Sequence, residues 1–124
     1  MQQSPWDVPL PVAWGTIRDV LDTSKVHTGT GGTHGWRVEK EDDSRGIIQA
    51  QLSFNEQVGG MTNVQVLPRT VQIQAFLKAD GGSTKVETHY AVFSPMNYER
   101  VKTIVTETQK ELSAAAARNK GGEQ

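Results

Sequence analysis

Four stretches of the chain alternate between apolar and polar residues, and this pattern most restricts what the chain can fold into. Period-two alternation is typical of β-strands with one buried face. The stretches lie at about residues 36–41, 47–54, 70–77 and 84–93. Because each has a single apolar side, we expect an antiparallel sheet that is covered on that side alone.

Two polar turns join these stretches into hairpins. Residues 42–46 separate the first pair, and residues 80–83 separate the second pair. Aspartate side chains bond nearby backbone N–H groups, and glycine adopts the positive φ that tight turns require. Pro68 lacks the N–H that a sheet ladder uses, so we predict that the third strand begins near Thr70. The result is a four-stranded antiparallel meander.

Two further segments show no periodicity and are predicted to be loops. Residues 27–35 contain four glycines, and residues 57–63 contain the pair Gly59-Gly60. The first segment is not typical of a phosphate-binding loop, because a helix precedes it, a strand follows it, and no Lys-Ser or Lys-Thr ends it. We interpret it as a connector.

Amphipathic helices are predicted on both sides of the four stretches. In the first helix, Pro11 suits the first helical position and apolar residues then recur every three or four positions to Leu21. Gly15 costs about 1 kcal/mol there relative to alanine, and we expect a close neighbour to explain it. The second helix is predicted over 95–118, with Ser94 as its N-cap.

The expected architecture follows from the need to bury these apolar faces. A chain of 124 residues is the size of one domain. We predict a single α+β domain over residues 6–118, with flexible tails at 1–5 and 119–124. Its fold is a two-layer sandwich in the order α-β-β-β-β-α, with both helices on one face of the meander.

Composition excludes several classes of function. A formal net charge of −1 argues against a nucleic-acid binder that depends on a basic surface. No apolar run approaches the roughly 20 residues that span a bilayer, so we expect no transmembrane segment. The absence of cysteine excludes disulfides, thiol catalysis and a lipid-modified cysteine within this sequence.

Motifs for catalysis or metal binding are missing as well. The three histidines, His27, His34 and His89, form neither an HExxH motif nor an i, i+4 pair on a helix. No serine stands in a Gly-x-Ser-x-Gly motif. We therefore predict a non-enzymatic protein with no catalytic residue, metal or cofactor.

The polar face of the sheet is the first candidate for function. Once the apolar face lies beneath the helices, this face remains open, and it is rich in amides and mixed in charge. We predict either a solvated surface or a docking surface for a protein partner or a second copy of the chain. The candidate contact residues are Gln49, Gln51, Gln72, Gln74, Phe76 and His89.

The space between helix and sheet is the alternative candidate. A long C-terminal helix lying across a curved antiparallel sheet is the layout of helix-grip ligand binders, which hold a small apolar molecule in that gap. Aromatic and apolar residues of both helices and of the sheet could line such a pocket here. The candidate pocket residues are Trp14, Trp36, Tyr90 and Val101.

Several short motifs also resemble those of small bacterial envelope domains, many of them lipoproteins of unknown function. The matching motifs are Val12-Ala13-Trp14, Gly35-Trp36-Arg37-Val38, Asp43-Ser44-Arg45-Gly46, Ile48-Gln49-Ala50 and Gly82-Ser83-Thr84-Lys85-Val86. Similar domains occur in lipoprotein subunits of the outer-membrane barrel-assembly machinery. The resemblance implies a structural or protein-interaction module of the periplasm or cell envelope, whereas Met1 as the native start implies the cytoplasm.

Overall fold

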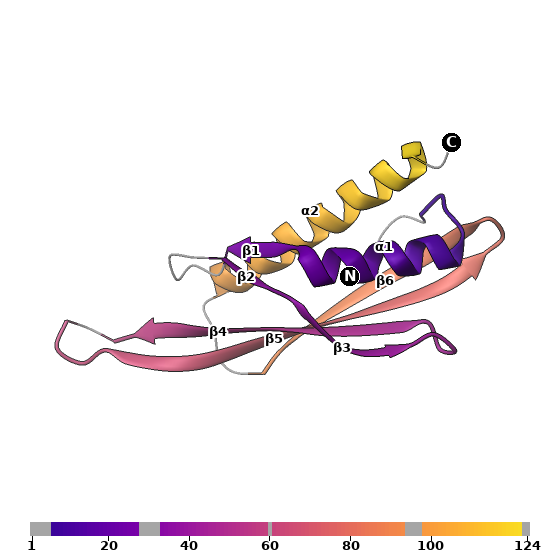
Figure 1. Cartoon of the computed structure of the whole chain (residues 1–124). Coiled ribbons are helices and arrows are strands. Elements are labelled where there is room, and N and C mark those ends of the chain that lie inside the picture. The colour runs from indigo at the N-terminus through magenta and orange to yellow at the C-terminus, as the bar shows by residue number, and fades with distance from the viewer. Residues whose placement is uncertain (1–5, 28–32, 60, 94–97, 123–124) are drawn as a thin grey trace.

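Two helices lie on one face of a four-stranded antiparallel sheet in the computed structural model, which describes residues 6–27, 33–59, 61–93 and 98–122 (Figure 1). The sheet has the order β3-β4-β5-β6, so consecutive strands are neighbours. This α+β meander beneath two helices is the predicted fold class. The strands of this sheet are β3 (Arg37–Asp42), β4 (Ile47–Val58), β5 (Gln65–Asp80) and β6 (Ser83–Val92).

The turn between β3 and β4 forms by the predicted chemistry. The Asp42 carboxylate accepts hydrogen bonds from the Ser44 hydroxyl at 2.7 Å and from the Arg45 backbone N–H at 3.3 Å. The Ser44 hydrogen bond is the main reason that the pKa of Asp42 is lowered. Gly46 then takes a φ of 71°, and Gly81 takes 65° in the turn between β5 and β6. Both hairpins therefore close where the sequence predicts.

The central hairpin is longer than predicted. β4 continues to Val58 and β5 already begins at Gln65, so Gln57 and Val58 of the predicted loop at 57–63 belong to β4 and the connection runs over residues 59–64. The prediction that β5 starts near Thr70 is wrong for a physical reason. Asn55 opposes Pro68 as a pair that exchanges no backbone hydrogen bonds, so the missing N–H of Pro68 faces away from β4 and the ladder continues past it.

A second, two-stranded sheet replaces part of the predicted glycine-rich connector. β1 (Lys25–His27) pairs antiparallel with β2 (Thr33–Gly35), and Val26 opposes His34. The element order is therefore α-β-β-β-β-β-β-α. Sequence periodicity cannot reveal strands of three residues, because such strands show hardly more than one alternation.

The first helix, α1 (Leu10–Thr23), begins after Pro9 and buries the predicted stripe. The Ser24 backbone N–H bonds the Val20 carbonyl at its C-terminal end. The expected close neighbour of Gly15 is missing among the described residues: a β-carbon placed there would meet nothing within 4 Å outside its own helix. Close packing therefore does not explain this glycine.

The second helix, α2 (Tyr98–Gly122), extends four residues past the predicted end at 118. Residues 119–122, which the sequence assigns to the C-terminal tail, are helical. The predicted N-cap Ser94 and the following Pro95 lie outside the described residues, as do the N-terminal residues 1–5. Figure 1 shows α2 crossing above the sheet beside α1.

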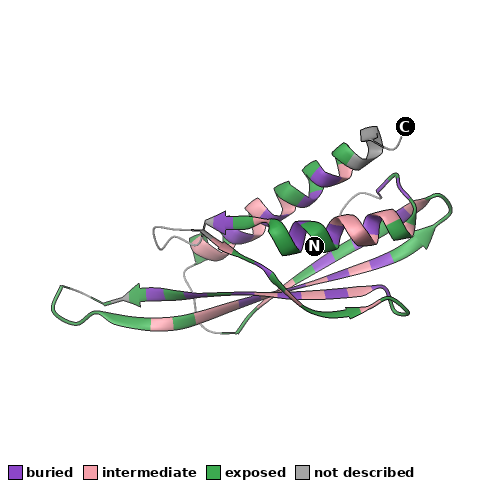
Figure 2. Cartoon of the chain, viewed as in Figure 1, coloured by how far each residue is buried: buried purple, intermediate pink, exposed green. Residues whose placement is uncertain are grey.

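The core lies between the inner face of the sheet and the two helices (Figure 2). Alternate residues of β4, β5 and β6 are buried, which confirms the period-two interpretation. Trp6 closes the sheet at β6, where its backbone exchanges hydrogen bonds with Thr84 at 2.8 and 2.9 Å. The largest fully buried side chains are Ile17, Leu21, Ile48, Leu52, Ile73, Ile104 and Leu112.

Candidate functional site

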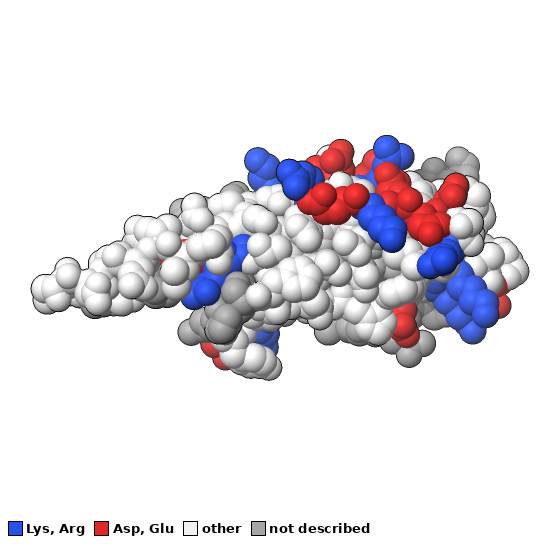
Figure 3. Space-filling view, turned by 90° about the horizontal axis from the view of Figure 1, so that it is seen from below, with Lys and Arg blue, Asp and Glu red and all other residues white. Residues whose placement is uncertain are grey.

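The outer face of the sheet, which is turned away from both helices, carries all six predicted contact residues. Gln74 Nε2 donates to Gln49 Oε1 at 3.1 Å, and Gln51 opposes Gln72 in the register of β4 and β5. Charged side chains gather along one side and at one end of this face, and its middle is uncharged (Figure 3). The four glutamines are half-buried, since neighbouring side chains cover part of each.

An aromatic contact lies on the same face. The rings of Phe76 and His89 meet edge to face with 5.2 Å between centroids, and His89 Nε2 lies 2.6 Å from Glu87 Oε1. Phe76 is half-buried, so it offers only part of its ring to a partner. The role of these residues in docking stays a prediction.

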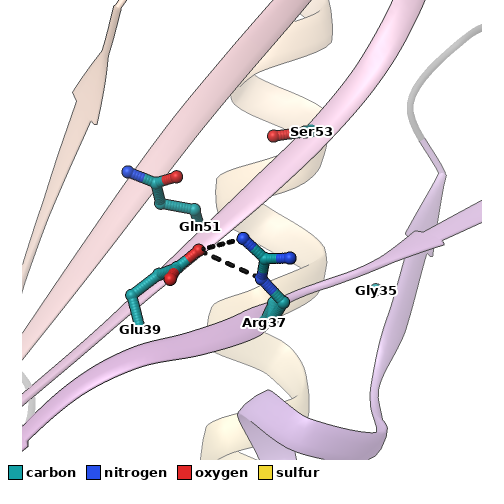
Figure 4. A pocket seen from close by; sticks show the side chains of 5 residues that line it. All are labelled: Gly35, Arg37, Glu39, Gln51 and Ser53. Carbon is teal, nitrogen blue, oxygen red and sulfur yellow. Dashed lines mark hydrogen bonds and ion pairs between the residues drawn. The ribbon is translucent and has the colours of Figure 1, made fainter.

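A hollow of about 230 Å³ opens at the β3 side of this face (Figure 4). Its lining residues are Gly35, Arg37, Glu39, Gln51 and Ser53. The Arg37 guanidinium donates to Glu39 Oε1 through two nitrogens, at 2.7 and 3.0 Å. Since these two charges satisfy each other in an exposed position, the hollow suits a weakly held polar group more than an apolar ligand.

Between helix and sheet, the structure brings two of the predicted pocket residues together. Trp36 is buried, its ring lies 6.3 Å from that of Tyr90, and its indole Nε1 donates to Thr108 Oγ1 on α2 at 3.0 Å. Tyr90 donates to Gln109 Oε1 at 3.0 Å, and Gln109 Nε2 donates to Thr88 Oγ1 at 3.1 Å. Burial raises the pKa of the Tyr90 phenol.

The other two predicted pocket residues lie on the helices. Trp14 of α1 and Val101 of α2 are both half-buried, and Trp14 packs against the edge of the core. Within the described ranges no ring contact joins Trp14 to Trp36 or Tyr90. Trp36 belongs to the hydrophobic core, and Trp14 and Tyr90 pack against the same core; a pocket lined by all four residues stays a prediction.

A group of three charged side chains, of which Glu56 is buried and two arginines are half-buried, lies at the inner face and was missed by the sequence analysis. We call it the Arg69–Glu56–Arg100 triad. Arg69 Nε donates to Glu56 Oε1 at 2.8 Å, and the Arg100 guanidinium pairs with Glu56 Oε2. The side chains of Glu56 and Arg69 are only 8% and 12% exposed, and that of Arg100 is 21% exposed. The triad joins β4, β5 and α2.

The alternation of inward-facing and outward-facing positions along β4 and β5 could have revealed two members of the triad. Glu56 continues the buried positions of β4 two residues beyond Phe54, and Arg69 continues those of β5 two residues before Val71. Charged residues in phase with an apolar face are unusual, because burial of an unpaired charge is costly. The sequence alone does not show that Arg100 of α2 reaches the same place.

The histidines are distributed over separate places. His34 lies against Phe54 with 5.8 Å between ring centroids, His89 is on the outer face, and the side chain of His27 lies outside the described residues. In the part of the chain that the structure describes, no three His, Cys, Asp or Glu side chains are grouped to hold a metal ion. None of the described helices is long and apolar enough to cross a membrane.

Comparison with solved structures shows that another protein has a similar fold. The chain is similar to the structure titled Crystal structure of Ara h 8.0201, with a TM-score of 0.63 and 15% sequence identity over 94% of each chain. At this identity the likeness concerns the fold. No protein-family model and no curated protein matches the chain.

Proposed function

We propose that the protein binds a small amphipathic molecule with an acidic group, held between α2 and the inner face of the sheet. The observation that carries this proposal is the Arg69–Glu56–Arg100 triad, in which two arginines share one buried glutamate. The three side chains carry a formal charge of +1. The two guanidinium groups would attract the acidic group of a ligand.

The position of the triad relates it to the apolar layer beneath α2. Arg100, Ile104, Thr108 and Leu112 are spaced by four residues and therefore follow one side of the helix. Ile104, Thr108 and Leu112 are buried. The acidic group of a ligand would lie at Arg100, and its apolar part would extend along the helix toward Trp36.

The layer between α2 and the sheet consists of side chains. The backbone of α2 comes close to α1 and β1. Long side chains link α2 to the four-stranded sheet, through Trp36 with Thr108, Tyr90 with Gln109, and Arg100 with Glu56. Long side chains can change rotamer, so this layer can adapt to a ligand more readily than a packed backbone contact can.

The chemistry of the triad favours a carboxylate or phosphate group. Arginine presents a planar fork of N–H donors that matches both anions. A buried ion pair often contributes little net stability, because desolvation offsets the attraction between its charges. The presence of two arginines at an otherwise apolar face is therefore better explained by binding than by stability.

The overall layout supports this choice of region. The long C-terminal helix above an antiparallel sheet is the helix-grip arrangement, and the similarity to Ara h 8.0201 extends over 94% of the chain. A site in that gap would combine a mostly apolar lining with a few convergent polar groups, as small-molecule sites commonly do.

Calorimetric titration with three probes of equal chain length tests the proposal. We expect octanoate to bind more tightly than octanol or octylamine, because only octanoate offers an anion to the arginines. Arg100→Gln should weaken octanoate binding by about tenfold or more and leave octanol binding unchanged. This variant retains the hydrogen bond between Arg69 and Glu56.

Arg18→Gln is the matched control, since it removes the same charge from an exposed residue of α1 whose Nε lies 3.4 Å from Glu41 Oε1. It should bind octanoate as the wild type does. Equal affinities for octanoate and octanol would contradict the role of the triad. Failure of all three probes to bind would refute the ligand-binding proposal itself.

A second candidate function is supported by the outer face. We propose that its uncharged middle, with the hollow beside Arg37, contacts a protein partner. Gln72→Ala combined with Gln74→Ala should disturb such association and leave the domain folded. A pull-down that returns the same partner with this variant and with the wild type would refute the role of this face. That the protein is located in the bacterial cell envelope likewise stays a proposal.

A further inference from the structure

The hairpin of β4 and β5 extends well beyond the helices (Figure 1). We call residues 55–58 of β4 and 65–68 of β5 the arm. β6 accompanies β5 only as far as Val71, opposite Val92, and the Phe93 N–H then bonds the Thr70 carbonyl at 3.1 Å. The arm therefore continues beyond the end of β6.

The backbone groups of β5 in the arm can be assigned to its two edges. The Leu77 N–H bonds the Gly46 carbonyl at 2.7 Å, and the register of β4 with β5 runs from there without a shift. Hydrogen-bonded pairs alternate along an antiparallel ladder, so Leu67 bonds β4 and the backbone groups of Val66 point away from it. Thr70, which bonds Phe93, lies on the same edge as Val66.

The sequence disfavours a continuation of β6 along this edge, because it would place two prolines opposite each other. If the register of β5 with β6 continued, Pro95 would stand opposite Pro68. Neither residue has an N–H to donate, so this pair cannot form hydrogen bonds in either direction. Among the described residues the ladder between β5 and β6 ends at Thr70, so no described residue of β6 pairs with the edge at Val66.

Beyond the buried Glu56, the arm lacks the charges that protect other strand edges. No charged residue occurs from Gln57 to Pro68. Val64 and Val66 are 56% and 57% exposed, and Met61 at the tip is fully exposed. Edge strand β3, in contrast, carries five charged residues among its six, and such charges discourage pairing with another chain.

We propose that the edge formed by Val64 and by residues 65–68 of β5 pairs with the same edge of a second copy of this chain, forming a two-fold symmetric dimer. With Val66 opposite Val66 of the second copy, each valine donates its N–H to the carbonyl of the other. The Val64 N–H of each copy then reaches the Pro68 carbonyl of the other. In this arrangement Pro68 takes part only through its carbonyl, which accepts a hydrogen bond, so its lack of an N–H does not weaken the pairing.

Two observations favour a second copy over a lipid surface. A two-fold axis brings each residue near its own copy, which an uncharged segment tolerates without repulsion. A bilayer would leave the N–H and carbonyl of Val66 without partners, which is costly in hydrocarbon. The interface would be small, below about 1,200 Å², so we expect a dissociation constant in the micromolar range.

Sedimentation velocity of the full chain over a range of concentrations tests this pairing. Wild-type protein should change from monomer to dimer as its concentration rises. Val66→Pro removes the central donor from the free edge of the arm, and we expect it to weaken the dimer by about tenfold or more. Proline is tolerated at a strand edge because the ladder to β4 does not use that N–H.

Gln57→Pro is the matched control. Gln57 opposes Val66 in the register, so its N–H points to the other edge of the arm and this variant should dimerise as the wild type does. Circular dichroism melts show whether both variants remain folded. A wild type that stays monomeric to about 1 mM, or a Val66→Pro variant that dimerises normally, would overturn the proposal. If the monomeric wild type instead floats with phosphatidylcholine vesicles, the binding partner of this edge is a membrane and not a second copy.

Discussion

Gly15 gives the most direct test of how this fold is stabilised. It lies in the interior of α1, where glycine is about 1 kcal/mol less favourable than alanine. The reason is that a glycine residue loses more conformational freedom than alanine does when the chain folds. Its backbone does not take a positive φ, and a β-carbon there would meet no described atom within 4 Å outside the helix. No steric cost therefore opposes the gain in helix propensity. Gly15→Ala should raise the free energy of unfolding by about 1 kcal/mol.

The corresponding change in melting temperature follows from the size of the chain. Unfolding entropy is about 2.1 cal/mol/K per residue, so for 124 residues the midpoint should rise by about 4 °C. Urea denaturation followed by circular dichroism measures the free energy, and thermal melts measure the midpoint. The slope of the urea transition should stay unchanged, since the methyl group hardly alters the surface that unfolding exposes.

Gly46→Ala is the opposing case. Gly46 has a φ of 71°, and a β-carbon there would collide with the carbonyl oxygen of Leu77 on the neighbouring strand β5. We expect this variant to lose about 2 kcal/mol or more. A Gly15→Ala variant that is less stable than the wild type, or a Gly46→Ala variant that is equally stable, would refute the reasoning from local conformation.

Two further predictions concern the layer between α2 and the sheet. Thr108→Val should lower the free energy of unfolding by about 1–3 kcal/mol in urea melts, because it leaves the buried Trp36 indole N–H without its acceptor; Thr108→Ser keeps the hydroxyl, and an equal loss in both variants would contradict this reason. Burial raises the pKa of Tyr90 above its usual value of about 10, so the folded state holds this proton more tightly than the unfolded state does. The resulting contribution to stability is complete below pH 10 and is lost as the pH rises above that value. Urea melts between about pH 8 and 11 should therefore show a steeper alkaline loss for the wild type than for Tyr90→Phe, and parallel curves would contradict the shift.

The sequence predicts the parts of this fold that depend on neighbouring residues. Alternation shows which side of each strand faces the core, and aspartate with glycine identifies both hairpin turns. The six predicted contact residues lie on one face because side chains alternate along a strand. Trp36 and Tyr90 are likewise in phase with the inner face, although the sequence could not show that Thr108 would bond the indole.

Other features depend on which strand lies on which side, and this only the tertiary structure decided. From sequence alone Pro68 is expected to end the strand. The register shows that its ring nitrogen faces away from β4, so the strand continues past it. β1 and β2 are too short to show a period, and each exists because the other pairs with it.

The triad shows the same division most clearly. Glu56 and Arg69 are each anomalous in sequence, being charged at positions where the pattern calls for apolar residues. Their meaning depends on Arg100, which is 44 residues further along than Glu56 and reaches it only because α2 crosses the sheet there. Local sequence determined the strands, the turns and the buried faces, since these follow from steric preferences and side-chain alternation. The site depends on contacts between distant segments, which form only when the chain packs.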